Sequence, residues 1–265
     1  MTERERNIYD ELILVLKKTG STEKHRGYHI IPERLNSRIE DESLKSRFVF
    51  YERERLSFIK SKVDVKGKKI LDIGCNTGYI LFDLLDSGAA DVTGFEGKPL
   101  CSEFLNKAVA LFGEEQRFHF HNRYFEFDEV KENYDVTVLL NVLHHVGDDY
   151  GDKGLNIKYA RKKILEQLNS LAGHTEYLVF QMGFNWQGNI SQCLFDNGTK
   201  GEMIEFIKNG IEGIWEIDAV GIPEKTNGIV EYKELNDSNI KRDDSLGEFL
   251  NRPLFILRSL KNSNE

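Results

Sequence analysis

Two carboxylates flank a glycine turn in the first half of the chain. Asp72 stands just before a turn that runs from Gly74 to Gly78, and Glu96 comes 22 residues after Gly74. A carboxylate at that second place can accept hydrogen bonds from both hydroxyls of a ribose. Asp72 would repel a phosphate and attract an ammonium group. The spacing therefore predicts a ligand that has a ribose and a positive charge but no phosphate.

The turn differs from the two common phosphate-binding loops. A dinucleotide-binding turn has a middle glycine that lets a pyrophosphate come close, and here Asn76 takes that place. A P-loop ends in Gly-Lys-Ser/Thr, whereas Gly78 is followed by Tyr79 and Ile80. S-adenosylmethionine (SAM) carries a ribose and a cationic amino-acid moiety without phosphate, so we expect it as the cofactor.

A pair of histidines could supply a general base. His144 and His145 follow the apolar run 134–140. Histidine is the side chain whose ordinary pKa best suits proton transfer at neutral pH, and a hydroxyl nucleophile benefits from such a base. Adjacent residues at a strand end point in roughly opposite directions. We therefore expect one of the two to face the acceptor, with His144 slightly favoured; packing of the loop is the alternative role.

Three loops carry candidate acceptor-binding residues. Phe184, Asn185 and Trp186 combine rings that can stack on sugar faces with an amide that can pair with hydroxyls; the alternative is a segment that packs its own small core. Arg252 lies just before the last predicted strand and would suit a phosphate or carboxylate. Tyr28 lies in an early loop rich in histidine and arginine, where functional groups are common.

An acidic loop follows the histidines. Asp148, Asp149 and Asp152 could hold a divalent cation, because hard cations prefer oxygen ligands. A solvated acidic loop is the favoured alternative, so no metal is predicted. The three cysteines have no metal-ligand spacing, and we interpret them as reduced thiols in a cytoplasmic protein.

Alternating strands and helices must position these residues. Strands are predicted at 69–73, 91–95, 117–121, 134–140, 176–181, 214–220 and 253–257, with a further candidate at 229–232. Helices are predicted at 78–86, 99–112, 155–171 and 200–209. Such alternation is typical of a doubly wound α/β fold with a mostly parallel sheet, in which ligands bind at the carboxyl ends of the strands.

Two helices are expected before this region. Apolar spacing predicts one over 6–18 and a second over 41–62. The second leads directly into the first strand, so its Tyr51 could reach the cofactor. We therefore divide the chain into an N-terminal helical extension or lid (1–66) and a catalytic domain (67–265) with an acceptor-side insertion at about 183–200.

Composition limits the classes of function. The 265 residues are 40% hydrophobic and 30% charged, an ordinary globular balance. The net charge of −8 argues mildly against nucleic acid as the main partner. No apolar run approaches the ~18 residues that a membrane span needs, and the charged N-terminus argues against a signal peptide. We expect a monomer or homodimer that does not bind membranes.

The segment 71–78 resembles motif I of the class I SAM-dependent methyltransferases, and Glu96 matches their ribose-binding acid. The segment 134–146 is similar to their fourth strand and the loop after it. The resemblance covers roughly 68–182. It implies a seven-stranded sheet of order 3-2-1-4-5-7-6 whose last strand, 253–257, is antiparallel.

The resemblance also implies which residues hold the cofactor. This chain lacks the aspartate that many members place after the third strand, so whether Asn122, Arg123 or Tyr124 contacts the adenine stays open; an Asn122 oxygen can accept from its amine. Together with Tyr51, the expected cofactor-binding residues are Asp72, Gly74, Cys75, Asn76, Gly78, Glu96, Gly97, Asn122, Tyr124 and Asn141.

Methyl transfer from SAM is the activity that the resemblance implies. The motifs are most similar to those of small-molecule and sugar O-methyltransferases, with a sugar or a surface-polysaccharide unit as acceptor. One alternative is a tRNA methyltransferase, because 71–94 is loosely similar to enzymes that alkylate a tRNA wobble uridine. The other is a non-catalytic SAM-binding module.

Overall fold

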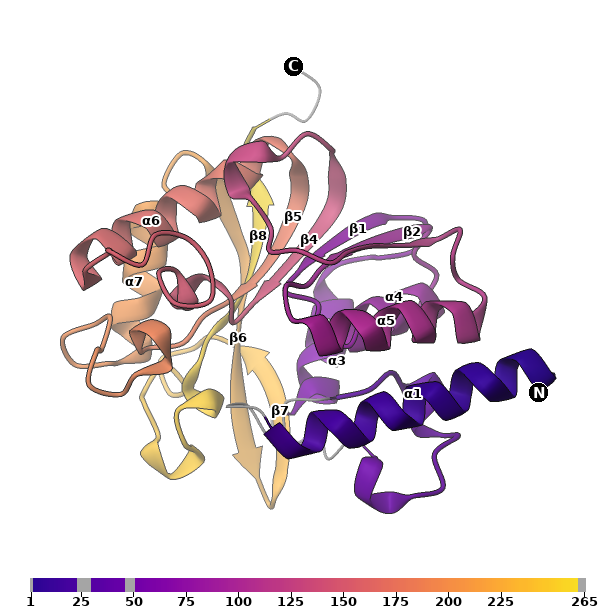
Figure 1. The fold of residues 1–265 in the computed structure, drawn as a ribbon. Coiled ribbons are helices and arrows are strands. Elements are labelled where there is room, and N and C mark those ends of the chain that lie inside the picture. The colour runs from indigo at the N-terminus through magenta and orange to yellow at the C-terminus, as the bar shows by residue number, and fades with distance from the viewer. Residues whose placement is uncertain (1, 23–29, 46–50, 262–265) are drawn as a thin grey trace. The chain divides into compact units, whose positions relative to one another are not determined.

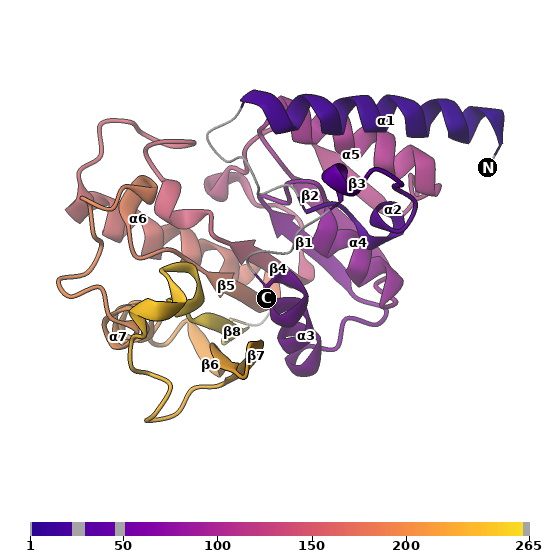
Figure 2. The same cartoon turned by 90° about the horizontal axis from the view of Figure 1, so that it is seen from below.

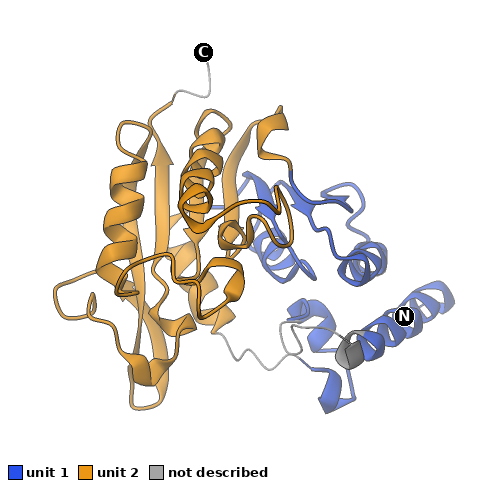
Figure 3. Ribbon diagram, turned by 60° about the vertical axis from the view of Figure 1, so that its left-hand side comes forward, with its two compact units in different colours: residues 1–49, 65–125 blue, residues 50–64, 126–265 orange. Residues whose placement is uncertain are grey.

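The computed structural model describes residues 2–22, 30–45 and 51–261, without the side chains of 19–22. The chain forms two compact units (Figure 3). Unit 1 comprises residues 1–49 and 65–125, and unit 2 comprises residues 50–64 and 126–265. The expected division at residue 66 into an extension and a catalytic domain remains a prediction.

Unit 1 contains three parallel strands in the order β3-β2-β1. They are β1 (Lys69–Ile73), β2 (Asp91–Phe95) and β3 (Phe118–His121). Its helices are α1 (Glu3–Thr22), α2 (Glu33–Asn36), α4 (Tyr79–Asp86) and α5 (Pro99–Phe112), with a 3₁₀ turn, η1 (Glu42–Leu44). Helix α1 runs along α5 in both Figure 1 and Figure 2.

One arginine fixes the N-terminal segment of unit 1 to the helices beside the sheet. Arg34 of α2 pairs with Asp86 at the end of α4 and with Glu114 just after α5. Its guanidinium also lies over the rings of Phe82 and Phe112. These ionic and cation–π contacts involve both helices, so the segment is anchored independently of its own short helix.

Unit 2 contains five strands in the order β4-β5-β8-β6-β7. They are β4 (Tyr134–Leu140), β5 (Thr175–Gln181), β6 (Trp215–Thr226), β7 (Ile229–Glu234) and β8 (Leu254–Ser259). Strands β4 and β5 pair in parallel, and the other pairings are antiparallel. The α-helices are α3 (Glu52–Lys62), α6 (Ile157–Ser170) and α7 (Lys200–Gly210).

Short 3₁₀ turns complete unit 2. They are η2 (Phe127–Glu129), η3 (Leu143–His145), η4 (Leu171–Gly173), η5 (Trp186–Gly188), η6 (Asp244–Leu246) and η7 (Phe249–Asn251). Strands β4, β5 and β8 form the centre of the unit, and Val138, Phe180 and Ile256 are fully buried there. Strands buried on both faces explain the continuous apolar runs in the sequence.

The α/β fold with an antiparallel last strand is confirmed, but the strand count was wrong. The described residues form eight strands in place of the seven that the resemblance implied, because the further candidate at 229–232 is confirmed as a full strand, β7, paired with β6. Asn227 and Gly228 connect the two with φ values of 53° and 84°. An Asn-Gly pair with positive φ is the usual two-residue turn of a tight hairpin. The extra strand thus comes from a local turn signal.

The expected continuous helix over 41–62 was also wrong. Helix α3 begins only at Glu52, and Lys45 after η1 has extended backbone angles. Tyr51 precedes α3 with a left-handed φ of 56°, which interrupts a helix. The first helix is instead longer than the expected 6–18. Among the described residues, no helix is long and apolar enough to cross a membrane.

Candidate functional site

The glycine turn of unit 1 adopts left-handed backbone angles. Gly74, Asn76 and Gly78 have φ values of 80°, 51° and 76°. At Gly78 a Cβ atom would lie 2.6 Å from a methyl carbon of Leu105 and 3.3 Å from the ring of Phe118. Only glycine satisfies both the backbone and the packing there. The turn therefore holds its shape at the carboxyl end of β1.

Glu96 is held by two backbone amides. One carboxylate oxygen accepts from the N–H of Asn76 at 3.0 Å, and the other accepts from the N–H of Lys98 at 2.8 Å. Burial raises the pKa of Glu96, while these two hydrogen bonds act in the opposite direction. Each oxygen keeps a further lone pair, so the oriented carboxylate can still accept from two ribose hydroxyls.

The expected adenine-side residues also meet in unit 1. A Cβ on Gly97 would lie 2.6 Å from the ring of Tyr124, so the ring covers this glycine closely. The side-chain oxygen of Asn122 accepts from the hydroxyl of Ser102 at 2.6 Å and retains one lone pair. A cradle without a Cβ, an aromatic ring and an amide oxygen fit an adenine, so these residues fit SAM.

Two more expected cofactor residues are buried beside the turn. Asp72 is 4% exposed at the end of β1. Cys75 is buried, and burial raises the pKa of its thiol well above the usual value, so it remains a protonated thiol. Cys75 therefore contributes shape and its backbone to the turn, because a neutral thiol is a poor nucleophile.

The two histidines of unit 2 lie on the turn η3 and not on a continuing strand. Their rings are 4.3 Å apart between centroids. The expectation that neighbouring residues point in opposite directions was wrong, because η3 replaces the strand geometry on which it depended. The two rings therefore form one contiguous group.

The two rings differ in environment. His144 is 2% exposed, and its Nδ1 accepts from the backbone N–H of Gly183 at 3.2 Å. Burial lowers the pKa of His144 well below its ordinary value, with the charges of His145 and Arg252 adding to the effect. The neutral ring thus carries its proton on Nε2. The side chain of His145 is 18% exposed, and its Nδ1 lies 3.9 Å from a carboxylate oxygen of Asp149.

A polar cluster lies where β4 and β5 end. Asn141 has a φ of 61°, and its amide donates to the side-chain oxygen of Gln181 at 3.2 Å. The same oxygen accepts from Nη1 of Arg55 at 2.9 Å, and the Gln181 amide donates to the carbonyl of Arg252 at 3.1 Å. The sequence indicated Asn141 and Arg252. Gln181 and Arg55 were missed, since one ends an apolar run and the other lies in a charged helix.

The guanidinium of Arg252 is hydrogen-bonded to two side chains of unit 2. Nε donates to the carboxylate of Glu248 at 3.1 Å, Nη2 pairs with the same carboxylate, and Nη1 donates to Asn141 at 2.8 Å. Glu248 in turn accepts from the backbone N–H of Phe184. In this arrangement Arg252 fixes the amide of Asn141 and connects it to the loop after β5.

The segment 183–200 buries its aromatic side chains. Phe184 is 1% exposed and Trp186 is 6% exposed, and the Trp186 indole donates to the carbonyl of Val146 at 2.7 Å. Asn185 forms an isolated β-bridge with Cys193. These contacts match the alternative in which the segment packs its own small core. Tyr28 lies outside the described residues, and Tyr51 is half-buried ahead of α3.

The acidic loop after η3 is organised by local bonds. Asp152 accepts from the backbone N–H of Gly154 at 2.8 Å. Within residues 2–22, 30–45 and 51–261, no group of three or more histidine, cysteine or acidic side chains is arranged to hold a metal ion.

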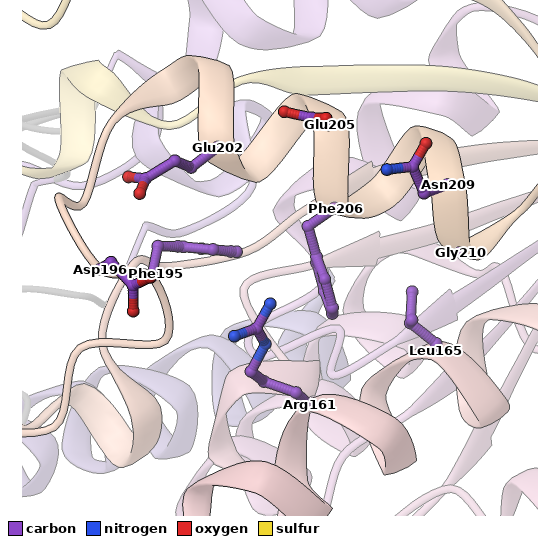
Figure 4. A pocket seen from close by; sticks show the side chains of 9 residues that line it. All are labelled: Arg161, Leu165, Phe195, Asp196, Glu202, Glu205, Phe206, Asn209 and Gly210. Atoms are coloured by element: carbon purple, nitrogen blue, oxygen red, sulfur yellow. The ribbon is translucent and has the colours of Figure 1, made fainter.

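A shallow pocket of about 420 Å³ lies between α6 and α7. The guanidinium of Arg161 stands over the ring of Phe206 at 5.0 Å and that of Phe195 at 5.9 Å, with Glu202 and Glu205 on the opposite wall (Figure 4). Glu202 is engaged in the capping box of α7, which lowers its pKa to about 2. None of the expected site residues lines this pocket.

Comparison with known proteins identifies related sequences and folds. Residues 44–191 match the family described as methyltransferase domain. The chain is 28% identical over 89 residues to a tRNA U34 carboxymethyltransferase of Helicobacter pylori (strain G27), covering 33% of this chain and 34% of that protein. It is 30% identical over 118 residues to the one of Aliarcobacter butzleri (strain RM4018), covering 39% and 36%.

These alignments span about a third of the relatives' length. Among solved structures, a co-crystal of WbdD with a kinase inhibitor superposes with a TM-score of 0.51 at 15% identity, covering 77% of this chain and 40% of that one. At this identity the likeness concerns the fold alone.

Proposed function

Because this chain belongs to the methyltransferase domain family of SAM-dependent enzymes, we propose that it methylates a hydroxyl group of a small molecule or sugar. The observation that supports this most is the pair of contacting histidines at the carboxyl end of β4, one of them beside a carboxylate. A hydroxyl acceptor needs such a base, whereas a stronger nucleophile does not. We therefore keep a histidine as the proposed general base.

His145 is the better candidate for the base. His144 uses Nδ1 to accept from Gly183 and carries its proton on Nε2, so neither nitrogen is open to a further proton. His145 is more exposed, and the carboxylate of Asp149, 3.9 Å from its Nδ1, can stabilise the imidazolium electrostatically after proton transfer. We therefore assign the general base to His145, in place of His144, which the sequence slightly favoured. His144 packs against the ring of His145.

The cofactor role falls to unit 1. When bound, SAM supplies a methyl group on a sulfonium sulfur that a nucleophile can displace. Glu96 would hold the ribose, Asp72 would attract the ammonium group, and Asn122 with Tyr124 would border the adenine. In unit 2, Gln181 and Arg252 fix the side-chain amide of Asn141 just beyond the end of β4.

Methyl-labelled SAM tests the proposal directly. The full chain is incubated with panels of free sugars, sugar nucleotides, small hydroxylated metabolites and total tRNA, and the labelled product is identified. We expect label in a small molecule, at an oxygen. Label in tRNA alone would contradict this acceptor class, and absence of label from every panel would favour a non-catalytic SAM-binding module.

Substitution of the base gives the first prediction. His145→Asn should lower kcat by about 100-fold or more while the affinity for S-adenosylhomocysteine stays unchanged. His144→Asn is the matched control, because the asparagine oxygen can still accept from Gly183, and it should cost less than about tenfold. Full turnover in His145→Asn would refute the base assignment.

A tRNA acceptor is the second candidate. The curated relatives are named for tRNA U34 and are 28–30% identical over a third of the chain. The net charge of −8 disfavours a long phosphate-contacting face. Retention of tRNA that falls steeply between low and moderate salt would support this candidate, and absence of binding at low salt would exclude it.

A further inference from the structure

Arg55 of α3 is a buried cation that forms no ion pair with any carboxylate of the described residues. It is 7% exposed, and Nη1 donates to the neutral side chain of Gln181. Its guanidinium also lies 5.4 Å from the ring centre of Phe249. Among the residues that the structure describes, Nε and Nη2 have no hydrogen-bond partner and no acid lies within ion-pair distance. By contrast, Arg252 in the same cluster is paired with Glu248.

An unpaired buried guanidinium is unfavourable. Burying a charge costs free energy unless an opposite charge or several hydrogen bonds compensate. Arginine cannot escape the cost by losing its proton. One bond to an amide oxygen satisfies only one of its five donors. The edge of the fork formed by Nε and Nη2 is therefore suited to an anion that comes from outside the chain.

A second unsatisfied donor lies in the same part of unit 2. The hydroxyl of Tyr232 on β7 is buried and makes no hydrogen bond of good geometry within the described ranges, although the side chain of Gln181 lies close to it. Burial raises the pKa of Tyr232. The charges of Arg55 and Arg252 and the side chain of Gln181 act in the opposite direction, and the negative charge of Glu52 raises the pKa further. The hydroxyl therefore lies near both arginines and near one buried carboxylate, that of Glu52. Its ring lies 6.1 Å from that of Phe58, one turn along α3 from Arg55.

The position of this group is that of a ligand site. Gln181, which anchors Arg55, is the last residue of β5. Ligands of open α/β sheets bind beyond the carboxyl ends of their strands. A guanidinium whose Nε and Nη2 are available and a phenolic hydroxyl recognise an oxyanion, and the planar fork matches carboxylate or phosphate oxygens.

We infer that Arg55 and Tyr232 bind a carboxylate or phosphate group of the acceptor. The inference rests on the proposed methyl transfer and narrows its acceptor to an anionic hydroxyl compound, such as a sugar acid or a sugar phosphate. Arg252, which was expected to bind the anion, instead fixes Asn141. The proposed anion site therefore lies in the same cluster as Arg252, but at Arg55 of α3.

Anion titration tests the inference without turnover. Inorganic phosphate and acetate are titrated by calorimetry into the full chain, with and without saturating S-adenosylhomocysteine, and unfolding temperatures are recorded in parallel. We expect binding of at least one anion to wild type, a loss of at least tenfold in Arg55→Met and a smaller loss in Tyr232→Phe. Arg258→Met is the matched control, since Arg258 is exposed and paired with Glu216 and Asp218.

Stability distinguishes ligand binding from a structural role. Without anion, Arg55→Met should unfold at the same or a higher temperature than wild type, because it removes an uncompensated buried charge. A clear fall in unfolding temperature with anion binding retained would overturn the inference, as would absence of phosphate and acetate binding to wild type. If Arg55→Met does not fold, phosphate and acetate are titrated into Arg55→Lys and Tyr232→Phe. Weaker anion binding in these variants supports the inference, and unchanged binding in both overturns it.

Two further measurements distinguish an anion of the acceptor from the carboxylate of the cofactor, and anion binding from methyl transfer. Unchanged affinity for S-adenosylhomocysteine in Arg55→Met assigns the oxyanion to the acceptor. A tenfold loss of that affinity would overturn the assignment and point to the cofactor's own carboxylate. Anion binding at Arg55 in a chain that transfers no methyl group would refute the proposed function and leave the anion site in place.

Discussion

The polar groups of the two units are assembled over very different distances along the chain. In unit 1, Glu96 meets Asn76 across 20 residues and Lys98 across two. In unit 2, Arg55 meets Gln181 across 126 residues, and Asn141 meets Arg252 across 111. The proposed cofactor cradle is built from one strand–turn–helix–strand segment, which leaves a motif in the sequence. The proposed acceptor site draws on four distant segments, which leave no such motif.

This difference suggests separate roles. The glycine turn and Glu96 of unit 1 depend on backbone shape and on a carboxylate that backbone amides orient. Such a rigid arrangement suits a single ligand, here the proposed SAM. The cluster of unit 2 depends on side chains whose partners are other side chains, so single substitutions can alter it. We therefore expect changes in unit 1 to affect stability and cofactor affinity, and changes in unit 2 to affect the acceptor.

The largest stability effect is expected in the glycine turn. Gly78→Ala should lower the free energy of unfolding by about 3 kcal/mol, since a Cβ at positive φ also overlaps Leu105. Gly113→Ala is the matched control, because its φ of 67° is similar and nothing lies within 4 Å of its Cβ. It should cost only about 1 kcal/mol. Equal losses in urea unfolding would show that packing does not shape the turn.

The affinity for the cofactor should respond to Glu96. Glu96→Gln keeps the side chain's size but replaces one acceptor oxygen with a donor, which cannot bond to the backbone N–H groups that now face the carboxylate. We expect the Kd for S-adenosylhomocysteine to rise about 100-fold, equivalent to about 2.7 kcal/mol. Calorimetry measures it, and a change below threefold would contradict the ribose role.

The sequence predicted unit 1 better than unit 2 for a physical reason. The left-handed angles at Gly74 and Gly78 and the carboxylate at Glu96 follow from local chemistry, which residue types reveal. The start of α3 at Glu52 depends on a left-handed backbone at Tyr51. Tyrosine rarely adopts this conformation, so the residue type does not predict it. Gln181 and Arg55 acquire their importance only through packing between distant segments, which periodicity does not report.

The histidine pair shows the same limit. Its position after β4 was predictable, but the choice between the two rings depended on the N–H of Gly183, 39 residues away from His144. The loop that carries Phe184 and Trp186 is likewise held by hydrogen bonds to Glu248 and Val146, which no local pattern indicates.

The smallest effect is a pH dependence of stability from unit 2. The folded chain keeps His144 neutral because burial lowers its pKa well below 6.5, whereas the unfolded chain binds a proton below about pH 6.5. Below that pH the unfolded state binds more protons than the folded state. The free energy of unfolding therefore decreases as the pH is lowered, by up to ~1.4 kcal/mol per pH unit. Urea unfolding at pH 7.5, 6.5 and 5.5 measures this contribution, and His144→Asn should make the dependence shallower. An unchanged slope would show that His144 titrates in the folded state.

The separation of roles between the units is tested most directly by one set of titrations. S-adenosylhomocysteine is titrated by calorimetry into wild type, Glu96→Gln and Arg55→Met. We expect one site per chain, a loss of about 100-fold in Glu96→Gln and an unchanged Kd in Arg55→Met. Equal losses in the two variants, or tight binding in both, would contradict the assignment of the cofactor to unit 1 and of the acceptor to unit 2.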